Sequence, residues 1–258
     1  MFEEERLRKI VEYVHQRSRA SVQELSELFH VSESTVRRDL KELEKRALLK
    51  RTHGGAVSLQ NVGFEPTYSE KEDKYRDEKQ RIAQKSLELI KDGDSIVIDS
   101  GTTTLLMAAG FSRFHNLTVV TNSINLIQKM SNMDGINVIS TGGMLRKNTM
   151  ALVGPTAEES LDKIHVDKAF IATNGLDLKY GLSTPSLTEA SIKEKMMAIA
   201  DQVFILADHS KIGMVSFAHF GNLPDVDAVV TGNTLTEAQK AEFGRLHIKL
   251  HLVDSQEE

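Results

Sequence analysis

The segment 21–43, SVQELSELFHVSESTVRRDLKEL, limits the fold of this chain more than any other, because it carries two helix-start signals separated by a turn. Ser21, followed three residues later by a glutamate, forms a capping box that predicts the start of a first helix. Ser32 is a favourable N-cap for a second helix. The intervening His30 and Val31 predict the turn. We therefore expect two short helices joined by a tight connection.

The predicted second helix has one apolar face and one basic face. Val36, Leu40 and Leu43 recur at helical spacing and are expected to point into a core. Such a helix suits the major groove of DNA, where Arg and Lys meet phosphates and guanine edges and Ser meets either. A helical hairpin with a solvated basic face is the simpler alternative. The hydroxyl and cationic side chains of the outer face are Ser34, Arg37, Arg38 and Lys41.

The segments on both sides favour the DNA-binding interpretation. Residues 3–15 carry an apolar stripe at helical spacing, which predicts a third helix. Downstream, Leu48–Thr52 predicts a strand, Gly54-Gly55 a tight turn and Ala56-Val57 the returning strand. Three helices and a hairpin make a winged helix-turn-helix, whose wing has basic residues beside glycines that let a backbone approach DNA. These basic residues are Lys50, Arg51 and His53.

Charge is distributed unevenly along the chain. Residues 1–60 hold 12 Lys and Arg against 10 Asp and Glu, a net charge of +2, and the remaining residues hold 20 against 27, a net charge of −7. DNA binding is therefore expected to be local to one end of an acidic protein. Because a weakly charged domain needs two copies on one duplex for useful affinity, we expect a homo-oligomer, either a dimer or a tetramer.

Composition argues against several other classes of protein. The chain has no cysteine, which excludes disulfides, thiol chemistry and cysteine-type zinc sites. No apolar run is long enough to span a bilayer, and Met1 begins no signal-peptide pattern, so we expect a cytoplasmic protein without a membrane partner. His247 and His251 alternate with apolar residues, which indicates a strand and not a metal site. We expect no metal, no cofactor and no catalytic residues.

The chain is predicted to divide into a DNA-binding domain at 1–57, a linker at 58–76 and a second domain at 77–258. Ser58–Tyr68 lacks periodicity, and a charged helix is predicted over Ser69–Lys91. Beyond it, apolar strand-like runs alternate with helical segments, which is typical of a Rossmann-like α/β domain with a mainly parallel sheet. The predicted strands are Ser95–Ile98, Leu117–Val120, Ile136–Ser140, Lys168–Ala172, Gln202–Ala207, Ala228–Thr231 and Lys249–Val253. The predicted helices are Thr103–Phe111, Ser123–Ser131, Pro155–Lys163, Thr188–Ala200 and Thr236–Arg245.

Three predicted strands lead directly into hydroxyls, amides or glycines, at Asp99–Thr104, Thr121–Ser123 and Ser140–Gly143. Because ligands bind at the carboxyl ends of parallel strands, we expect a shared anion pocket there, although helix capping is the alternative for any single loop. Lys211 follows another strand and can add a point charge. Glu189, at the start of a predicted helix, can bind sugar hydroxyls or offset the helix dipole, and we prefer the dipole.

The N-terminal segment resembles the DNA-binding domain of the DeoR/GlpR family of bacterial transcriptional regulators. The resemblance rests on TxRRDL at Thr35–Leu40 and on a basic residue followed closely by GGA at Arg51–Ala56. It supports a DNA-binding function for this end of the chain. The predicted DNA-binding residues are Ser32, Ser34, Thr35, Arg37, Arg38, Lys41, Arg51, Thr52, His53, Gly54 and Gly55.

The remaining chain resembles the DeoR-type sensor domain through DSGTTT, TNS, TGG, VDKAFIATNGLD and ADHSKIG, in that order. This resemblance implies a fold related to ribose-5-phosphate isomerase and a site for phosphorylated sugars or related metabolites. The implied effector-binding residues are Asp99, Ser100, Gly101, Thr102, Thr103, Thr104, Thr121, Asn122, Ser123, Gly142, Gly143 and Lys211.

These features predict an α/β protein with an N-terminal winged helix-turn-helix and a C-terminal Rossmann-like sensor domain. The predicted function is repression of a carbohydrate or polyol operon, with release from operator DNA by a phosphorylated sugar, polyol or amino sugar. One alternative is a sugar-phosphate isomerase-like enzyme with an appended DNA-binding module, but Thr173–Asp177 lacks the paired acids that such enzymes carry beyond a strand. A pure protein-interaction adaptor is a further alternative, disfavoured by the DNA-compatible basic face.

Overall fold

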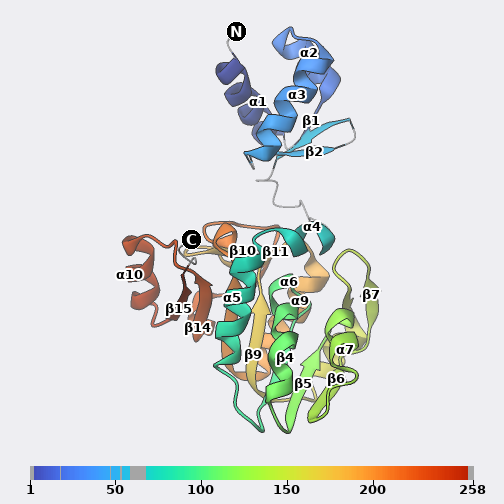
Figure 1. Cartoon of the computed structure of the whole chain (residues 1–258), viewed down its shortest axis with the longest axis vertical. Helices are drawn as coiled ribbons and strands as arrows, with labels where there is room; N and C mark the ends of the chain where they lie inside the picture. The colour runs from blue at the N-terminus through green and yellow to red at the C-terminus, as the bar shows by residue number, and fades with distance from the viewer. Residues whose placement is uncertain (1–2, 18, 47, 53, 59–67, 255–258) are drawn as a thin grey trace. The chain divides into compact units, whose positions relative to one another are not determined.

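The computed structural model describes residues 3–17, 19–46, 48–52, 54–58 and 68–254. The chain forms two compact units, residues 1–64 and 65–258, whose elements are labelled in Figure 1. Each unit has its own hydrophobic core. Helix α4 (Tyr68–Asp73) falls within the segment 58–76 that we predicted as a linker, and it packs against helix α6 (Thr102–Leu105) of the second unit.

The described residues of the first unit form three helices and a three-stranded antiparallel sheet of order β1-β3-β2. The predicted three helices and hairpin are confirmed, and β1 is an additional strand that the sequence did not indicate because three residues are too few to show a period. The elements are α1 (Glu3–Arg17), β1 (Arg19–Ser21), α2 (Val22–Phe29), α3 (Glu33–Lys45), β2 (Lys50–Thr52) and β3 (Gly55–Val57).

The helix starts follow from the capping residues. Ser21 Oγ accepts a hydrogen bond from the backbone N–H of Glu24 at 3.0 Å, and the Glu24 carboxylate accepts one from the Ser21 N–H at 3.3 Å. Ser32 Oγ accepts from the Thr35 N–H at 3.2 Å and begins α3. His30 takes the left-handed conformation, φ 53°, that reverses the chain between them. Side chains from all three helices then form one core, including Ile10, Leu25, Val36, Leu40 and Leu43.

Gly55 is the first residue of β3 and not part of the turn, contrary to the sequence-based expectation. A Cβ atom at Gly55 would lie 2.0 Å from the carbonyl oxygen of Ala20, so the position is limited to glycine by the close approach of β1. The predicted strand over Leu48–Thr52 begins later, at Lys50. His53, between the two strands, lies outside the described residues.

The second unit is built on a seven-stranded, fully parallel sheet of order β15-β14-β12-β9-β4-β5-β6. All seven predicted strands are present. From β4 the chain adds β5 and then β6 on one side. It then returns to the other side of β4, where it adds β9, β12, β14 and β15 in turn. The strand order therefore reverses between β4 and β9, which is where Rossmann-like sheets bind ligands. The strands are β4 (Ser95–Ile98), β5 (Leu117–Thr121), β6 (Ile136–Ser140), β9 (Val166–Ala172), β12 (Ala200–Ala207), β14 (Ala228–Gly232) and β15 (Lys249–Val253).

Helices cover both faces of this sheet, which explains why its strands are continuous apolar runs. Alternate residues of β4 enter different cores: Ile96 and Ile98 pack with α5, η1 and α7, whereas Val97 packs with α8, α9 and α10. The helix predicted at Thr103–Phe111 is instead a short α-helix followed by a 3₁₀ segment. The helices are α5 (Arg76–Leu87), α6 (Thr102–Leu105), η1 (Leu106–Arg113), α7 (Ile124–Met130), α8 (Pro155–Leu161), α9 (Leu187–Ala198), η2 (His209–Lys211), η3 (Leu223–Asp225) and α10 (Glu237–Arg245).

Two small antiparallel sheets, which the sequence did not indicate, complete the unit. One is the hairpin of β7 (Met144–Arg146) and β8 (Ala151–Val153), and the other is the β10-β11-β13 sheet. No described helix is long and apolar enough to cross a membrane. The strands of the second small sheet are β10 (Gly175–Asp177), β11 (Gly181–Thr184) and β13 (Ala218–Gly221).

Candidate functional site

Helix α3 presents the predicted basic face to solvent. Val36 and Leu40 are buried in the core of the unit. Arg37 Nη2 forms an exposed ion pair with Glu33 Oε2 at 2.7 Å, a type of contact that holds a side chain only weakly. Ser32 Oγ accepts the capping hydrogen bond of the helix and also lies within hydrogen-bond distance of the Ser34 and Thr35 hydroxyls, at 2.8 and 2.9 Å. The exposed side chains of the predicted DNA-contacting set on α3 are Ser34, Arg37, Arg38 and Lys41, and Thr35 is half-buried.

A buried ion pair behind this face joins α1 to α3. Arg6 Nε lies 2.6 Å from Asp39 Oδ2, and Arg6 Nη2 lies 3.1 Å from Asp39 Oδ1. The hydrogen bond to Asp39 is the largest influence on Arg6 and raises the pKa of its guanidinium. Sequence reasoning missed this pair, although Asp39 comes three residues after Val36 and four before Leu43 and so lies on the buried face. The pair orients the basic face of α3 relative to α1.

The wing carries the remaining predicted DNA-binding residues. Arg51, Thr52 and Gly54 are exposed, whereas Gly55 is buried against β1. The backbone N–H of Arg51 donates to Glu44 Oε1 at 2.9 Å and so links β2 to the last turns of α3. This hydrogen bond does not involve the Arg51 guanidinium. Gly54 accepts from the Val22 N–H at 2.8 Å through its carbonyl oxygen.

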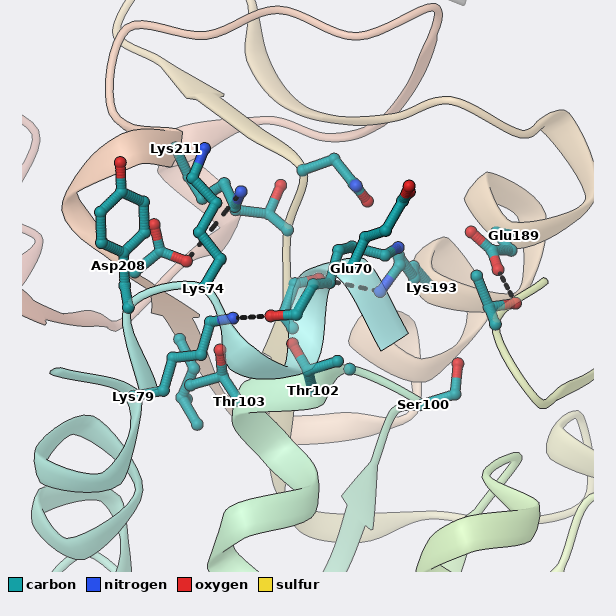
Figure 2. A pocket seen from close by; sticks show the side chains of 18 residues that line it. Glu70, Lys74, Lys79, Ser100, Thr102, Thr103, Glu189, Lys193, Asp208 and Lys211 are labelled. Atoms are coloured by element: carbon teal, nitrogen blue, oxygen red, sulfur yellow. Dashed lines mark hydrogen bonds and ion pairs between the residues drawn. The ribbon is translucent and has the colours of Figure 1, made fainter. Parts of the chain in front are cut away.

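The second unit has a pocket of about 110 Å³ at the carboxyl ends of its strands. It lies where the strand order reverses, with walls from the residues that follow β4, β9 and β12 and from helices α4, α5 and α9. Figure 2 shows Lys74, Lys79 and Lys211 on one side of this pocket and Glu189 on the opposite side, with Lys193 between them. The observed location is the one that the parallel topology predicts.

Five of the predicted effector-binding residues line the pocket: Ser100, Gly101, Thr102, Thr103 and Lys211. Two others stand directly behind its wall. Asp99 is fully buried, and Thr104 Oγ1 donates to its Oδ1 at 2.9 Å.

The other predicted effector residues have structural partners and do not line the pocket. Thr121 Oγ1 donates to the carbonyl oxygen of Ile98 at 2.7 Å, and Asn122 Nδ2 donates to that of Leu152 at 3.2 Å. Ser123 Oγ caps α7, which is the capping alternative considered above. Gly142 and Gly143 adopt positive φ angles between β6 and β7. Because β5 and β6 continue the sheet away from the point of reversal, these loops lie beyond the pocket.

The cations of the pocket come mainly from helices. Lys193 of α9 is 7% exposed, and its Nζ binds the Asp99 carboxylate and the Ala172 carbonyl oxygen, the latter at 2.8 Å. Lys79 of α5 is 3% exposed, and its Nζ donates to the carbonyl oxygen of Lys71 in α4. Sequence reasoning did not identify either lysine as a site residue. The available signal was that Lys193 lies four residues from Glu189 and Met197, both of which are buried.

Burial is the largest influence on Lys79 and lowers its pKa to about 8. Asp208 opposes this shift, while the nearby ammonium groups of Lys211, Lys71 and Lys74 reinforce it. Lys211 Nζ lies 4.0 Å from Asp208 Oδ2. The pocket therefore concentrates positive charge that its own carboxylates compensate only partly.

Glu189 has a role in the pocket beyond the helix dipole that we preferred from the sequence. It lies in the first turn of α9, but it is only 5% exposed and lines the pocket. Its Oε1 accepts hydrogen bonds from Thr149 Oγ1 at 2.5 Å and Arg146 Nη1 at 3.2 Å. Burial favours the neutral acid, but Lys193, Thr149 and Arg146 outweigh it and hold the pKa of Glu189 below its usual value.

A winged helix-turn-helix unit and a Rossmann-like unit with a ligand pocket, on one chain, define a transcriptional regulator with its own sensor. Residues 6–62 match the DeoR-like helix-turn-helix domain, and residues 74–233 match the DeoR C terminal sensor domain. The chain belongs to the DeoR family of transcriptional regulators.

Curated relatives align over nearly the whole chain. The uncharacterized HTH-type transcriptional regulator YulB of Bacillus subtilis is 42% identical, over 91% of this chain and 90% of the relative. The HTH-type transcriptional regulator GlpR of Haloferax volcanii is 41% identical, over 94% and 95%. The HTH-type transcriptional repressor GlcR of Bacillus subtilis is 34% identical, over 100% and 99%. Among solved structures, ribose 5-phosphate isomerase A from Methanocaldococcus jannaschii aligns with a TM-score of 0.38 and 17% identity, over 52% of this chain and 53% of that chain.

The comparisons support a regulator and do not favour the isomerase alternative. The relatives are named as transcriptional regulators and repressors, so the chain is a DNA-binding protein and not an enzyme. In the region where an isomerase would carry paired acids, Asp177 Oδ1 accepts the backbone N–H groups of Lys179 and Tyr180, each at 2.9 Å. Asp177 therefore stabilises a turn and does not line the pocket.

Proposed function

We propose that this protein is a repressor of a carbohydrate or polyol operon and that a phosphorylated sugar, polyol or amino sugar releases it from its operator. The observation that carries the effector class is the composition of the pocket lining, in which five lysines stand against three carboxylates. A phosphate group supplies the missing negative charge and accepts hydrogen bonds from ammonium and hydroxyl donors. The lysines are Lys71, Lys74, Lys79, Lys193 and Lys211.

The strand-end hydroxyls complete the proposed phosphate site. Ser100, Thr102 and Thr103 line the pocket beside the lysines, and each hydroxyl can donate one hydrogen bond. Gly101 stands between them where a Cβ atom would lie 2.4 Å from the Ala172 Cβ, so this loop is packed directly against the end of β9. That packing keeps the hydroxyls of the loop at the point of strand reversal.

Helix α4 offers a route from the pocket to the DNA-binding unit. Glu70 and Lys71 of α4 line the pocket, and α4 directly follows residues 59–67, which connect the two units in sequence. A ligand that contacts α4 acts on the segment leading to the DNA-binding unit. Release from DNA then requires only that the ligand bind the DNA-free state more tightly than the DNA-bound state.

The DNA-binding mode we propose uses α3 in the major groove and the wing on the phosphate backbone. Arg38 and Lys41 are exposed on α3, and Arg51 is exposed on the wing. One such unit contacts a single half-site, so we propose that a homo-oligomer, a dimer or tetramer, binds the operator. The protein acts in the cytoplasm in this account.

Thermal unfolding of the full chain tests the effector class. Phosphorylated sugars, polyol phosphates and amino-sugar phosphates would be compared with their unphosphorylated parents. A ligand at a hundred times its dissociation constant stabilises the protein by about 2.7 kcal/mol, and we expect this only from phosphorylated compounds. The stabilisation should disappear in Lys211→Ala. Equal stabilisation by the unphosphorylated parents, or none by any compound, would contradict the proposal.

A further inference from the structure

The end of the pocket opposite the lysine side has a different chemistry. Figure 2 places Glu189 across the pocket from Lys74, Lys79 and Lys211. Glu189 and Asn174 both line this end, and Thr184 stands behind them with its hydroxyl in contact with both side chains. A phosphate group held by the lysines leaves this end to the rest of the ligand.

The Glu189 carboxylate retains hydrogen-bonding capacity on one oxygen. Oε1 already accepts from Thr149 and Arg146, whereas among the described residues Oε2 accepts only from the Thr184 hydroxyl, at 3.3 Å. That hydroxyl also lies 3.1 Å from Asn174 Oδ1. Because a hydroxyl has one hydrogen, Thr184 can satisfy Glu189 or Asn174 but not both. Oε2 is therefore available as an acceptor at the pocket wall.

Asn174 supplies the complementary donor. Its Oδ1 faces the Thr184 hydroxyl, which leaves the Nδ2 group as the donor end of the amide. Among the described residues, Asn174 Nδ2 donates to no protein acceptor, although the side chain is half-buried and lines the pocket. A carboxylate acceptor and an amide donor whose side chains contact the same Thr184 hydroxyl match a ligand hydroxyl, which donates one hydrogen bond and accepts others.

The local charge favours a neutral ligand group over a charged one. Arg146 Nη1 lies 3.2 Å from Glu189 Oε1, and Lys193 follows one helical turn later in α9, so the carboxylate charge is already balanced. A ligand ammonium would add an excess positive charge here. A second phosphate or carboxylate would meet the Glu189 oxygens directly, which is unfavourable for two anions.

We propose that Glu189 and Asn174 together recognise a hydroxyl group of the effector, so that the pocket selects phosphorylated polyhydroxy compounds over phosphate itself. This inference rests on the proposed function, because the lysine side must hold the phosphate for the hydroxyl to reach Glu189. Glu189 and Asn174 are then specificity-determining residues, and the lysines supply affinity common to all phosphorylated ligands.

The test compares how much each variant of the full-length protein weakens the binding of a hydroxylated ligand with how much it weakens the binding of inorganic phosphate. Isothermal titration would measure binding of inorganic phosphate, glycerol 3-phosphate, glucose 6-phosphate, glucitol 6-phosphate and glucosamine 6-phosphate. We expect Glu189→Gln and Asn174→Ala each to weaken the tightest hydroxylated ligand at least tenfold and inorganic phosphate less than twofold. Glu194→Gln, the same change at an exposed position of α9, should alter neither affinity. Asn174→Ala removes no charge and serves if Glu189→Gln does not fold.

Three other outcomes would overturn the inference, and one of them would also overturn the proposed function. Equal loss of phosphate and hydroxylated ligand in both variants, or unchanged binding in both, overturns the hydroxyl assignment while the proposed function stands. Binding of glucosamine 6-phosphate at least tenfold more tightly than glucose 6-phosphate also overturns it, because Glu189 would then be an ammonium site. Failure of all phosphorylated compounds, phosphate included, to bind the unmodified protein would overturn the proposed function and this inference with it.

Discussion

Lys193 of α9 and Asp99 at the end of β4 form a buried ion pair directly behind the proposed phosphate site. Lys193 also donates to the Ala172 carbonyl oxygen at the end of β9. One ammonium group therefore joins the two strands between which the strand order reverses. This contact explains how a lysine can be nearly excluded from solvent and still line the pocket.

Breaking this pair should destabilise the protein strongly. Lys193→Met leaves the Asp99 carboxylate buried without its counter-ion, for which the expected loss is about 3–5 kcal/mol of unfolding free energy. The double variant Lys193→Met with Asp99→Asn removes both charges and should recover much of that loss. Urea unfolding of the single and double variants measures the difference. If the two changes destabilised the protein additively, Lys193 and Asp99 would not act as a pair.

The Arg6–Asp39 pair gives a second prediction, in the DNA-binding unit. Arg6→Met leaves Asp39 as an uncompensated buried charge, so we expect about 3–5 kcal/mol of lost stability, and the double variant with Asp39→Asn should recover part of it. Arg8→Met is the matched control, because Arg8 is exposed and its ion pair with Glu12 lies at the surface. Comparable destabilisation by Arg6→Met and Arg8→Met would show that the buried Arg6–Asp39 pair affects the unfolding free energy no more than a surface ion pair does.

Operator affinity should depend on Arg38. Among the described residues Arg38 has no ion-pair partner, and its exposed guanidinium is available for base or phosphate contacts. Arg38→Ala should weaken operator binding by roughly 1–3 kcal/mol, measured by fluorescence anisotropy at fixed salt. Arg113→Ala, an exposed arginine of the other unit, is the control. Unchanged affinity in Arg38→Ala together with Arg37→Ala would rule out α3 as the DNA-reading helix.

The lowered pKa of Lys79 predicts a pH dependence of anion binding. Lys79 loses its proton near pH 8 in the folded protein, so affinity for inorganic phosphate should fall as pH rises above about 8, by up to about tenfold per unit. A bound phosphate raises the pKa of Lys79, and the complex should therefore take up a proton at pH 8–9. Lys79→Arg keeps its charge there, and its phosphate affinity should stay level. A level profile in the unmodified protein would exclude Lys79 from the phosphate site.

The same pKa fixes the sign of a stability effect. Between pH 8 and 10.5 the unfolded chain keeps the Lys79 proton that the folded chain has lost, so the unfolding free energy should rise with pH through this range. Urea unfolding at several pH values measures this slope, with Lys79→Met as the reference. If Lys79→Met showed the same slope as the unmodified protein, other groups would be responsible.

Local patterns in the sequence predicted most of the fold. The capping box at Ser21, the N-cap at Ser32 and the seven apolar runs are short-range signals, and each corresponds to an observed element. The strand β1 and the two small sheets were missed because their strands have only three or four residues each, too few for a period. Gly55 was placed in the turn because its close contact with Ala20 depends on β1.

The pocket was only partly predictable, because its composition depends on long-range packing. The loop after β4 was identified since the strand end and the hydroxyls are adjacent in sequence. Lys79, Lys193 and Glu189 reach the pocket from helices, and their burial depends on how those helices pack against distant parts of the chain. The loop at Thr121–Ser123 has similar chemistry, but it follows β5, which lies on the side of β4 away from β9. Only the order of the strands in the sheet shows that this loop caps a helix and does not line the pocket.

In the proposed mechanism, ligand binding in the pocket and operator binding are coupled in one molecule. The most direct test is a linkage measurement, in which the affinity of the full-length protein for its operator is determined with and without the phosphorylated compound that binds it most tightly. Coupling requires that the ligand weaken operator binding and that operator DNA weaken ligand binding by the same factor, for which about 5–150-fold is typical. We expect both effects in the unmodified protein and neither in Lys211→Ala. Operator affinity that does not change at saturating ligand would contradict the account.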